Sequence, residues 1–228
     1  MTDYIPTGFR ALDEILGGWR KKSITLLIGE SGVGKSTLLI ASAYHSLVKG
    51  LNVKYIDTEG NPVEEFLGRM NIEHIDSMDS LLDCVCRLER IPVEILYDGL
   101  IIVDSITFHY HAVIRSLEND SERDRLQAML ENIIYKLHRI SVKNNLAVVM
   151  STWPTSIGDP EEDFVGGFAV KTYSRTQVRI LPESSDVRLL EIIKHQWPRR
   201  YKNVCRISLN EVLHVLEAEV VENVKQGV

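Results

Sequence analysis

The chain has 228 residues, enough for one large domain with a substantial core, and its 44% hydrophobic and 25% charged residues are ordinary for a soluble globular protein. The net charge of −6 argues against a protein that coats nucleic acid non-specifically. No apolar run is long enough to cross a bilayer and the N-terminus lacks the features of a signal peptide, so we expect a cytoplasmic protein without membrane contact.

Short apolar runs alternate with helical patterns along most of the chain. Residues 23–29, SITLLIG, predict a buried strand, and the stretch after Gly34 has helical spacing up to a terminating Gly50. Three further runs are nearly continuous in apolar residues, which is typical of strands covered on both faces of a parallel sheet: 53–57, 100–104 and 146–150. The clearest helical stripe runs from Leu126 to Ile140.

Strands that alternate with helices predict an α/β fold, with a mostly parallel sheet flanked by helices. From residue 176 the pattern changes to two strand-like runs around a Pro/Ser turn, which predicts a C-terminal antiparallel hairpin. No internal repeat or linker interrupts the sequence, so we expect residues 1–228 to form a single domain.

The run GESGVGKS, from Gly29 to Ser36, fits the pattern G-x-x-x-x-G-K-[ST] and lies between a predicted strand and a predicted helix. Its glycines allow the backbone to curl so that N–H groups surround phosphate oxygens, and the helix adds its positive N-terminal dipole. Lys35 then reaches the β- and γ-phosphates, Ser36 binds Mg²⁺ and Thr37 donates to the α-phosphate. We therefore expect ATP and Mg²⁺ as ligands, with the nucleotide held by Gly29, Glu30, Ser31, Gly32, Val33, Gly34, Lys35, Ser36 and Thr37.

Two carboxylates are expected beside this loop. LIIVD, residues 100–104, places Asp104 where a buried strand ends, in a position to hold the magnesium. Glu59 follows the strand 53–57, and strand ends in a parallel sheet gather around the ligand at its carboxyl edge. Glu59 and Lys35 are therefore the catalytic candidates, with Glu59 orienting or deprotonating the attacking water. A solvated loop carboxylate is the alternative for Glu59, and Asp57, still inside the strand, is expected to be structural.

Four segments resemble the RecA-like recombinase ATPases, specifically the archaeal RadA and RadB group, and occur in the family's order: TGFRALDEILGG (7–18), DTEG (57–60), LIIVDSITFHYHAV (100–113) and VGGFAVKTYSRTQVRI (165–180). The resemblance implies an archaeal protein with a RecA-type P-loop ATPase core, in which ATP lies at the edge of one protomer and is often completed by a neighbour. It also implies that Glu59 is the hydrolytic base.

The sequence departs from the family pattern at several positions. RadA-type recombinases carry an N-terminal DNA-binding domain and a polymerisation motif, whereas this sequence starts at the core, so we expect a core-only, RadB-like RadA paralogue. Phe66 lies where the family has an arginine against the adenine, and is a candidate for stacking on the base. Leu117 replaces an arginine of the first DNA loop, and Ser151-Thr152-Trp153 replaces the Thr-Asn-Gln whose glutamine senses the γ-phosphate.

In this family the strand 188–194 and the turn after it contact the ATP of a neighbouring subunit. The resemblance therefore makes Lys194 and His195 candidates for nucleotide binding in trans, with a solvated basic turn as the alternative.

The second DNA loop of the family corresponds to residues 152–167, TWPTSIGDPEEDFVGG, which carry four carboxylates and no lysine or arginine. Such a loop would repel phosphates, whereas Trp153 and Phe164 favour contact with a protein partner, with plain flexibility as the alternative. Residues 171–206, with nine Lys/Arg against three acids, are the part of the chain that can contact DNA phosphates.

Three functions follow from these observations. The first is an ATP-binding, slowly hydrolysing recombinase paralogue that modulates homologous recombination or DNA repair, with the main recombinase or another paralogue as partner. It would bind single-stranded DNA weakly or not at all and form a monomer or small oligomer. The alternatives are a direct single-stranded-DNA-binding ATPase and a KaiC-like signalling ATPase or kinase that acts on protein partners.

Overall fold

The computed structural model describes residues 3–61, 71–154, 167–195, 203–210 and 212. Its strands are, in chain order, β1 (Tyr4–Ile5), β2 (Trp19–Arg20), β3 (Ser23–Ile28), β4 (Val53–Asp57), β5 (Asn71–His74), β6 (Leu100–Asp104), β7 (Ala147–Thr152), β8 (Ser174–Pro182), β9 (Val187–Lys194) and β10 (Val204–Ser208). Its helices are α1 (Arg10–Leu16), α2 (Lys35–Val48), α4 (Met78–Arg90), α5 (Val93–Leu96), α6 (Phe108–Ile114), α7 (Asp120–Lys143) and α8 (Gly167–Tyr173).

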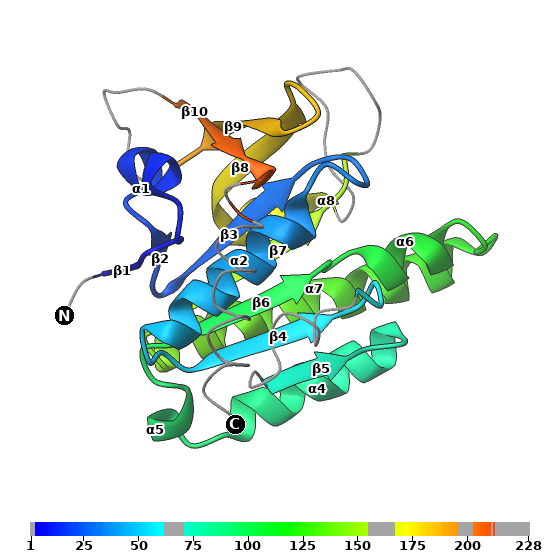
Figure 1. Ribbon diagram of the computed structural model, residues 1–228. Helices are drawn as coiled ribbons and strands as arrows, with labels where there is room; N and C mark the ends of the chain where they lie inside the picture. Colours follow the sequence, from blue (N-terminus) through cyan, green and yellow to red (C-terminus); the bar gives the residue numbers. More distant parts are fainter. Residues whose placement is uncertain (1–2, 62–70, 155–166, 196–202, 211, 213–228) are drawn as a thin grey trace, which may run out of the picture.

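An eight-stranded sheet forms the centre of the fold, in the order β10-β9-β8-β3-β7-β6-β4-β5 (Figure 1). The strands from β8 to β5 pair in parallel, whereas β9 pairs antiparallel with both β8 and β10. The short strands β1 and β2 form a separate antiparallel pair. The predicted α/β fold with its C-terminal antiparallel hairpin is therefore confirmed.

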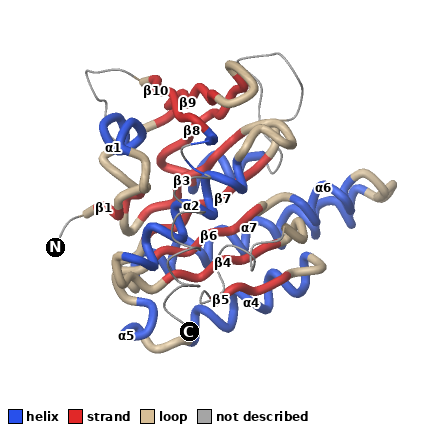
Figure 2. Tube along the Cα trace, in the orientation of Figure 1, coloured by secondary structure: helices blue, strands red, loops and turns tan. Residues whose placement is uncertain are grey.

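Helices cover both faces of this sheet (Figure 2), and each face has its own apolar cluster. Alternate residues of a strand join opposite clusters, as the period of two in an extended chain requires. In β6, Leu100 and Ile102 join the cluster that contains α1 and α2, whereas Ile101 and Val103 join the cluster that contains α4 and α7. This double coverage explains why the central strands are apolar at nearly every position.

The strands 53–57 and 100–104 and the helix after Gly34 were predicted correctly, and β7 runs two residues further than the predicted 146–150. The predicted hairpin corresponds to β8 and β9, which pair from Gln177 to Pro182 with Lys194 to Arg188. Edge strands such as β5 (NIEH) and β10 (VCRIS), and the short helices, were not predicted, because they lack the continuous apolar run of the central strands and are too short to show a clear periodicity.

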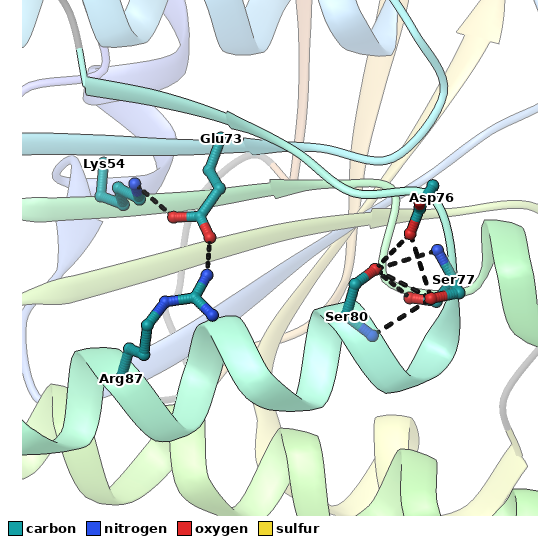
Figure 3. A network of polar contacts seen from close by, with 6 residues as sticks. All are labelled: Lys54, Glu73, Asp76, Ser77, Ser80 and Arg87. Carbon is teal, nitrogen blue, oxygen red and sulfur yellow. Dashed lines mark hydrogen bonds and ion pairs between the residues drawn. The ribbon is translucent and has the colours of Figure 1, made fainter.

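The edge strand β5 and helix α4 form a unit that the sequence prediction missed, although α4 carries recognisable signals. Ser77 caps the helix by accepting the Ser80 N–H at 3.2 Å, and the Ser77 N–H reaches the Ser80 hydroxyl in return (Figure 3). Glu73 of β5 joins this unit to the sheet, because its carboxylate contacts both Lys54 of β4 and Arg87 of α4 (Figure 3).

Parallel pairing brings the carboxyl ends of β3, β7, β6 and β4 to one edge of the sheet. The phosphate loop follows β3 and Glu59 follows β4, while Asp104 ends β6 and Thr152 ends β7. The order of the strands therefore gathers the residues that the sequence singled out. Among the described residues no helix is long and apolar enough to span a membrane.

Candidate nucleotide-binding site

The phosphate loop, residues 29–34, connects β3 to the first turn of α2. Gly32 and Gly34 have φ angles of +75° and +101°, the left-handed region that favours glycine. Gly29 is required for space, because an added Cβ would lie 2.7 Å from Cγ1 of Val33 and 3.1 Å from the carbonyl oxygen of Ile180. The loop ends at the N-terminus of a 14-residue helix, where free N–H groups and the helix dipole favour an anion.

Lys35 lies across the start of this loop. Its Nζ donates to the carbonyl oxygens of Gly29 at 3.0 Å and Glu30 at 2.9 Å, and the residue is 5% exposed. Burial lowers the pKa of Lys35 below its ordinary value, while the nearby carboxylates of Glu59 and Asp104 oppose that shift. An ammonium has three donors, so one donor of Lys35 remains for a phosphate oxygen.

Asp104 is fully buried at the end of β6, and hydrogen bonds hold both of its carboxylate oxygens. The hydroxyl of Tyr55 donates to Oδ2 at 2.8 Å, and the hydroxyl of Ser151 donates to Oδ1. Burial, and then the charge of Asp104, raise the pKa of Tyr55 well above its ordinary value, so its hydroxyl remains a donor. Each carboxylate oxygen still has capacity for a second hydrogen bond, for example from water.

The oxygen donors at this edge suit Mg²⁺. Magnesium is usually bound by one or two carboxylates, several waters and the phosphates of the substrate, not by a cage of protein ligands. Within the described part of the chain no cluster of three or more His, Cys, Asp or Glu side chains could hold a metal ion without a substrate. Asp104, together with the hydroxyl of Ser36 in the first turn of α2, fits the magnesium of a bound nucleotide.

Glu59 lies close to Lys35 and Asp104. Its charge interacts with the charges of both side chains, and Lys35 interacts with both carboxylates. Burial, and then the charge of Asp104, raise the pKa of Glu59, and Lys35 opposes them. The hydroxyl of Ser105 also opposes the rise in this pKa. The Oε1 atom of Glu59 is buried and meets no donor at hydrogen-bonding geometry among the described residues. This oxygen is therefore available to a water molecule or a ligand.

The loop that carries Glu59 is held from both sides. Oδ1 of the buried Asp57 accepts the N–H of Glu59 at 3.2 Å, and its Oδ2 lies 3.0 Å from Nδ1 of His74. The hydroxyl of Thr58 donates to the carbonyl of Ser105 and accepts the N–H of that residue, both at 2.8 Å. Asp57 is therefore structural, as the sequence indicated.

The last residues of β7 and Trp153, which follows it, are packed into the fold. Thr152 is fully buried, its carbonyl accepts the N–H of Gly29 at 3.3 Å, and its hydroxyl lies 2.7 Å from that of Thr107. The ring of Trp153 meets those of Phe108 and His111 edge-on, at centroid distances of 5.8 and 5.5 Å. Thr152 therefore contacts the phosphate loop through its backbone, while Trp153 packs against α6.

The remaining candidates lie away from this cluster or outside the described residues. Phe66 and most of the 152–167 loop lie outside the described residues. Lys194 ends β9 beside Gln177, and its Nζ donates to the carbonyl of Lys171 at 2.7 Å. His195 follows it, and β9 directs both residues away from the phosphate-loop end of the hairpin. Neither residue joins the site of its own chain, so a contact with ATP would require a second copy.

Arg188, at the opposite end of β9, does contact the phosphate loop, because its Nε donates to the carbonyl of Val33 at 2.7 Å. Neither Arg188 nor Tyr55 was a candidate from the sequence, and Ser151 was not expected to bond Asp104. A signal was available for Arg188, since β9 runs antiparallel to β8 and its first residues must return to the edge where the phosphate loop lies.

A parallel sheet with this phosphate loop, a buried aspartate on a neighbouring strand and an antiparallel C-terminal hairpin define a RecA-type P-loop ATPase core. The family model "ATPase: KaiC" matches residues 5–82, a span that includes the phosphate loop and Glu59.

Similarity to named proteins extends over most of the chain. A protein named DNA repair and recombination protein RadB from Methanoculleus marisnigri is 29% identical over 212 residues, which cover 86% of this chain and 90% of the relative. A RadB from Methanococcus maripaludis is 27% identical over 210 residues, 85% of this chain and 92% of the relative. DNA repair and recombination protein RadA from Aeropyrum pernix is 28% identical over 216 residues, 83% of this chain and 66% of the relative. The resemblance to the RecA-like recombinase ATPases, and within them to RadB and RadA, is therefore confirmed.

The two hydrogen bonds to Asp104 predict a stability effect. Tyr55→Phe removes a buried hydrogen bond to a charged acceptor, so we expect it to lower the free energy of unfolding by about 1.5–3 kcal/mol. Urea denaturation measures the change, and Tyr97→Phe is the control because Tyr97 is 41% exposed. Equal unfolding free energies for the two variants would contradict the role given to the Tyr55 hydroxyl.

Proposed function

We propose that the chain binds and hydrolyses Mg²⁺-ATP and modulates homologous recombination or DNA repair as a paralogue of an archaeal recombinase. The observation that carries the proposal is the grouping of Lys35, Glu59 and Asp104 beside the phosphate loop. The names of the RadB and RadA relatives support a role in recombination and repair. The ATPase family model supports the enzymatic activity.

The proposed mechanism assigns one task to each group. The loop N–H groups other than those of Gly29 and Val33, which donate to the carbonyls of Thr152 and Glu30, donate to the phosphates, and Lys35 turns its remaining donor to the β- and γ-phosphates. Ser36 and Asp104 would hold a magnesium ion, which would neutralise charge on those phosphates. Glu59 orients the attacking water and accepts its proton as the bond between the γ-phosphorus and the bridging oxygen breaks. Thr37 donates to the α-phosphate.

Slow hydrolysis is part of the proposal, because Lys35 is the cation that the described residues place beside Glu59 and Asp104, and stabilising the γ-phosphate charge calls for a second one. Lys194 and His195 lie at the end of β9 that is remote from the phosphate loop of the same chain. A neighbouring copy or a partner would have to supply this charge. We propose that the chain works as a monomer or small oligomer, and that the main recombinase or another paralogue is the partner.

The KaiC-like alternative is favoured by the family model, which matches residues 5–82. An ATPase or kinase of that kind would act on protein partners. Transfer of radiolabel from the γ-phosphate of ATP to Ser or Thr residues would support it and would count against the proposed function.

The alternative of direct binding to single-stranded DNA is favoured by the cluster of Lys171, Arg175 and Lys194. Burial, and then the charges of Arg175 and Lys171, lower the pKa of Lys194, as expected where cations crowd together. Binding that falls steeply with added salt would support this alternative, whereas the proposed function predicts weak or no binding at low salt.

Glu59→Gln tests the proposed hydrolysis. Glutamine keeps the shape of the side chain but cannot accept the proton, so we expect turnover to fall by at least about a hundredfold with ATP affinity unchanged. The assay is phosphate release by the wild type and the variant, with and without single-stranded DNA and with an archaeal RadA recombinase added. Glu14→Gln is the control, because that carboxylate is exposed on α1. Undiminished hydrolysis by Glu59→Gln would remove Glu59 from the mechanism.

The same role predicts a pH dependence. Burial and the charge of Asp104 raise the pKa of Glu59. Glu59 therefore takes up a proton at a higher pH than an ordinary glutamate, whose pKa is about 4.3. Because the base must be ionised, hydrolysis should decline as the pH falls through this raised pKa. The ratio kcat/KM, which reports the pKa of the free protein, measured from about pH 9 to 4 checks this. A rate that stays constant down to about pH 4.5 in folded protein would contradict it.

A further inference from the structure

The phosphate loop rests against the C-terminal hairpin and the residues that follow it. A Cβ added to Gly34 would lie 3.0 Å from Cδ2 of Leu209, and one added to Gly29 would lie 3.1 Å from the carbonyl of Ile180. Val33 is 5% exposed and belongs to the same apolar cluster as Ile180 and Ile207. The side of the loop that faces the hairpin is therefore closed, and a phosphate must approach from the other side.

Arg188 joins the loop to the turn of the hairpin. Its Nε donates to the carbonyl of Val33 at 2.7 Å. Its Nη1 lies within hydrogen-bonding distance of three carbonyls of the turn, those of Ser184 at 2.8 Å, Val187 at 3.1 Å and Ser185 at 3.3 Å. The planar guanidinium group has donors in a fixed fork, so one side chain fixes the loop and the turn relative to each other.

The turn is a firm support for this contact. The backbone oxygen of Asp186 accepts the N–H of Leu209 at 2.8 Å, and its Oδ1 accepts the N–H of Asn210 at 2.7 Å. The hydroxyl of Ser208 in β10 donates to Oδ2 of the same aspartate. Arg188 therefore connects the phosphate loop to a turn that is itself held by β10 and the residues after it.

Peptide geometry gives the contact a consequence for phosphate binding. The carbonyl of Val33 and the N–H of Gly34 belong to one planar trans peptide, so they point in opposite directions. Because Arg188 holds the carbonyl toward the hairpin, the Gly34 N–H points to the open side of the loop. The positive charge of the guanidinium group behind the loop also favours an anion in front of it.

We propose that Arg188 is a positioning residue of the nucleotide site, which orients the Gly34 N–H toward the phosphates by holding the Val33 carbonyl. This inference rests on the proposed binding of ATP. It gives the C-terminal hairpin a part in nucleotide affinity that does not depend on a neighbouring subunit.

Arg188→Met tests the proposal, with Arg206→Met as the matched control. Arg206 lies on the neighbouring strand, where its guanidinium group pairs with Glu183 of the same turn and not with the phosphate loop as far as the structure describes it. We expect Arg188→Met to weaken the binding of ATP, measured by calorimetric titration, by about tenfold, and Arg206→Met to leave it unchanged. Equal affinities for wild type and Arg188→Met would overturn the proposal.

Arg188→Lys separates charge from geometry. Lysine keeps the positive charge and most of the stem, but a single ammonium lacks the rigid fork that bridges the loop and the turn. We expect Arg188→Lys to bind ATP nearly as weakly as Arg188→Met. Affinity equal to that of the wild type would show that charge alone matters and would overturn the positioning role.

Hydrogen exchange without nucleotide distinguishes this inference from the proposed function. Amides of residues 29–37 should exchange faster in Arg188→Met than in wild type or Arg206→Met, because the loop has lost its support. Unchanged exchange at these amides would overturn the inference even if ATP binds. Wild-type protein that binds no ATP would instead refute the proposed function, while this exchange difference would still test the contact.

Discussion

The buried ammonium of Lys35, close to the carboxylates of Glu59 and Asp104, is the interaction on which the candidate site depends. Burial of each charge is unfavourable alone, and their proximity offsets part of that cost. The three residues come from the ends of different elements, α2, β4 and β6, so the group exists only if the sheet has its observed order. A bound nucleotide would add negative phosphates and a divalent cation to a group of charges that is already arranged for them.

Much of this arrangement could be predicted from the sequence, because the informative signals are local. Continuous apolar runs gave the central strands, and the spacing of glycines and Lys35 gave the phosphate loop between β3 and α2. Asp104 and Glu59 were found because each directly follows buried strand residues, and parallel strands collect their carboxyl ends at one edge. The assignment of these residues to catalysis and ligand binding stays a prediction.

The partners of those residues could not be predicted, because they depend on which strands are neighbours. Tyr55 and Ser151 reach Asp104 only because β6 lies between β4 and β7. Arg188 reaches Val33 only because the hairpin turn returns to the phosphate-loop edge. The same register explains why Lys194 and His195 lie away from the loop of their own chain, a result that a linear motif does not contain.

Binding of ATP in the presence and absence of Mg²⁺ by wild type and Lys35→Ala tests the central claim most directly. Calorimetric titration should show that wild type binds ATP more tightly with Mg²⁺, and that Lys35→Ala loses at least about tenfold in affinity while remaining folded by circular dichroism. Equal affinity of folded Lys35→Ala and wild type for Mg²⁺-ATP would contradict the account, because the loop would then not bind phosphate in the way that its geometry indicates.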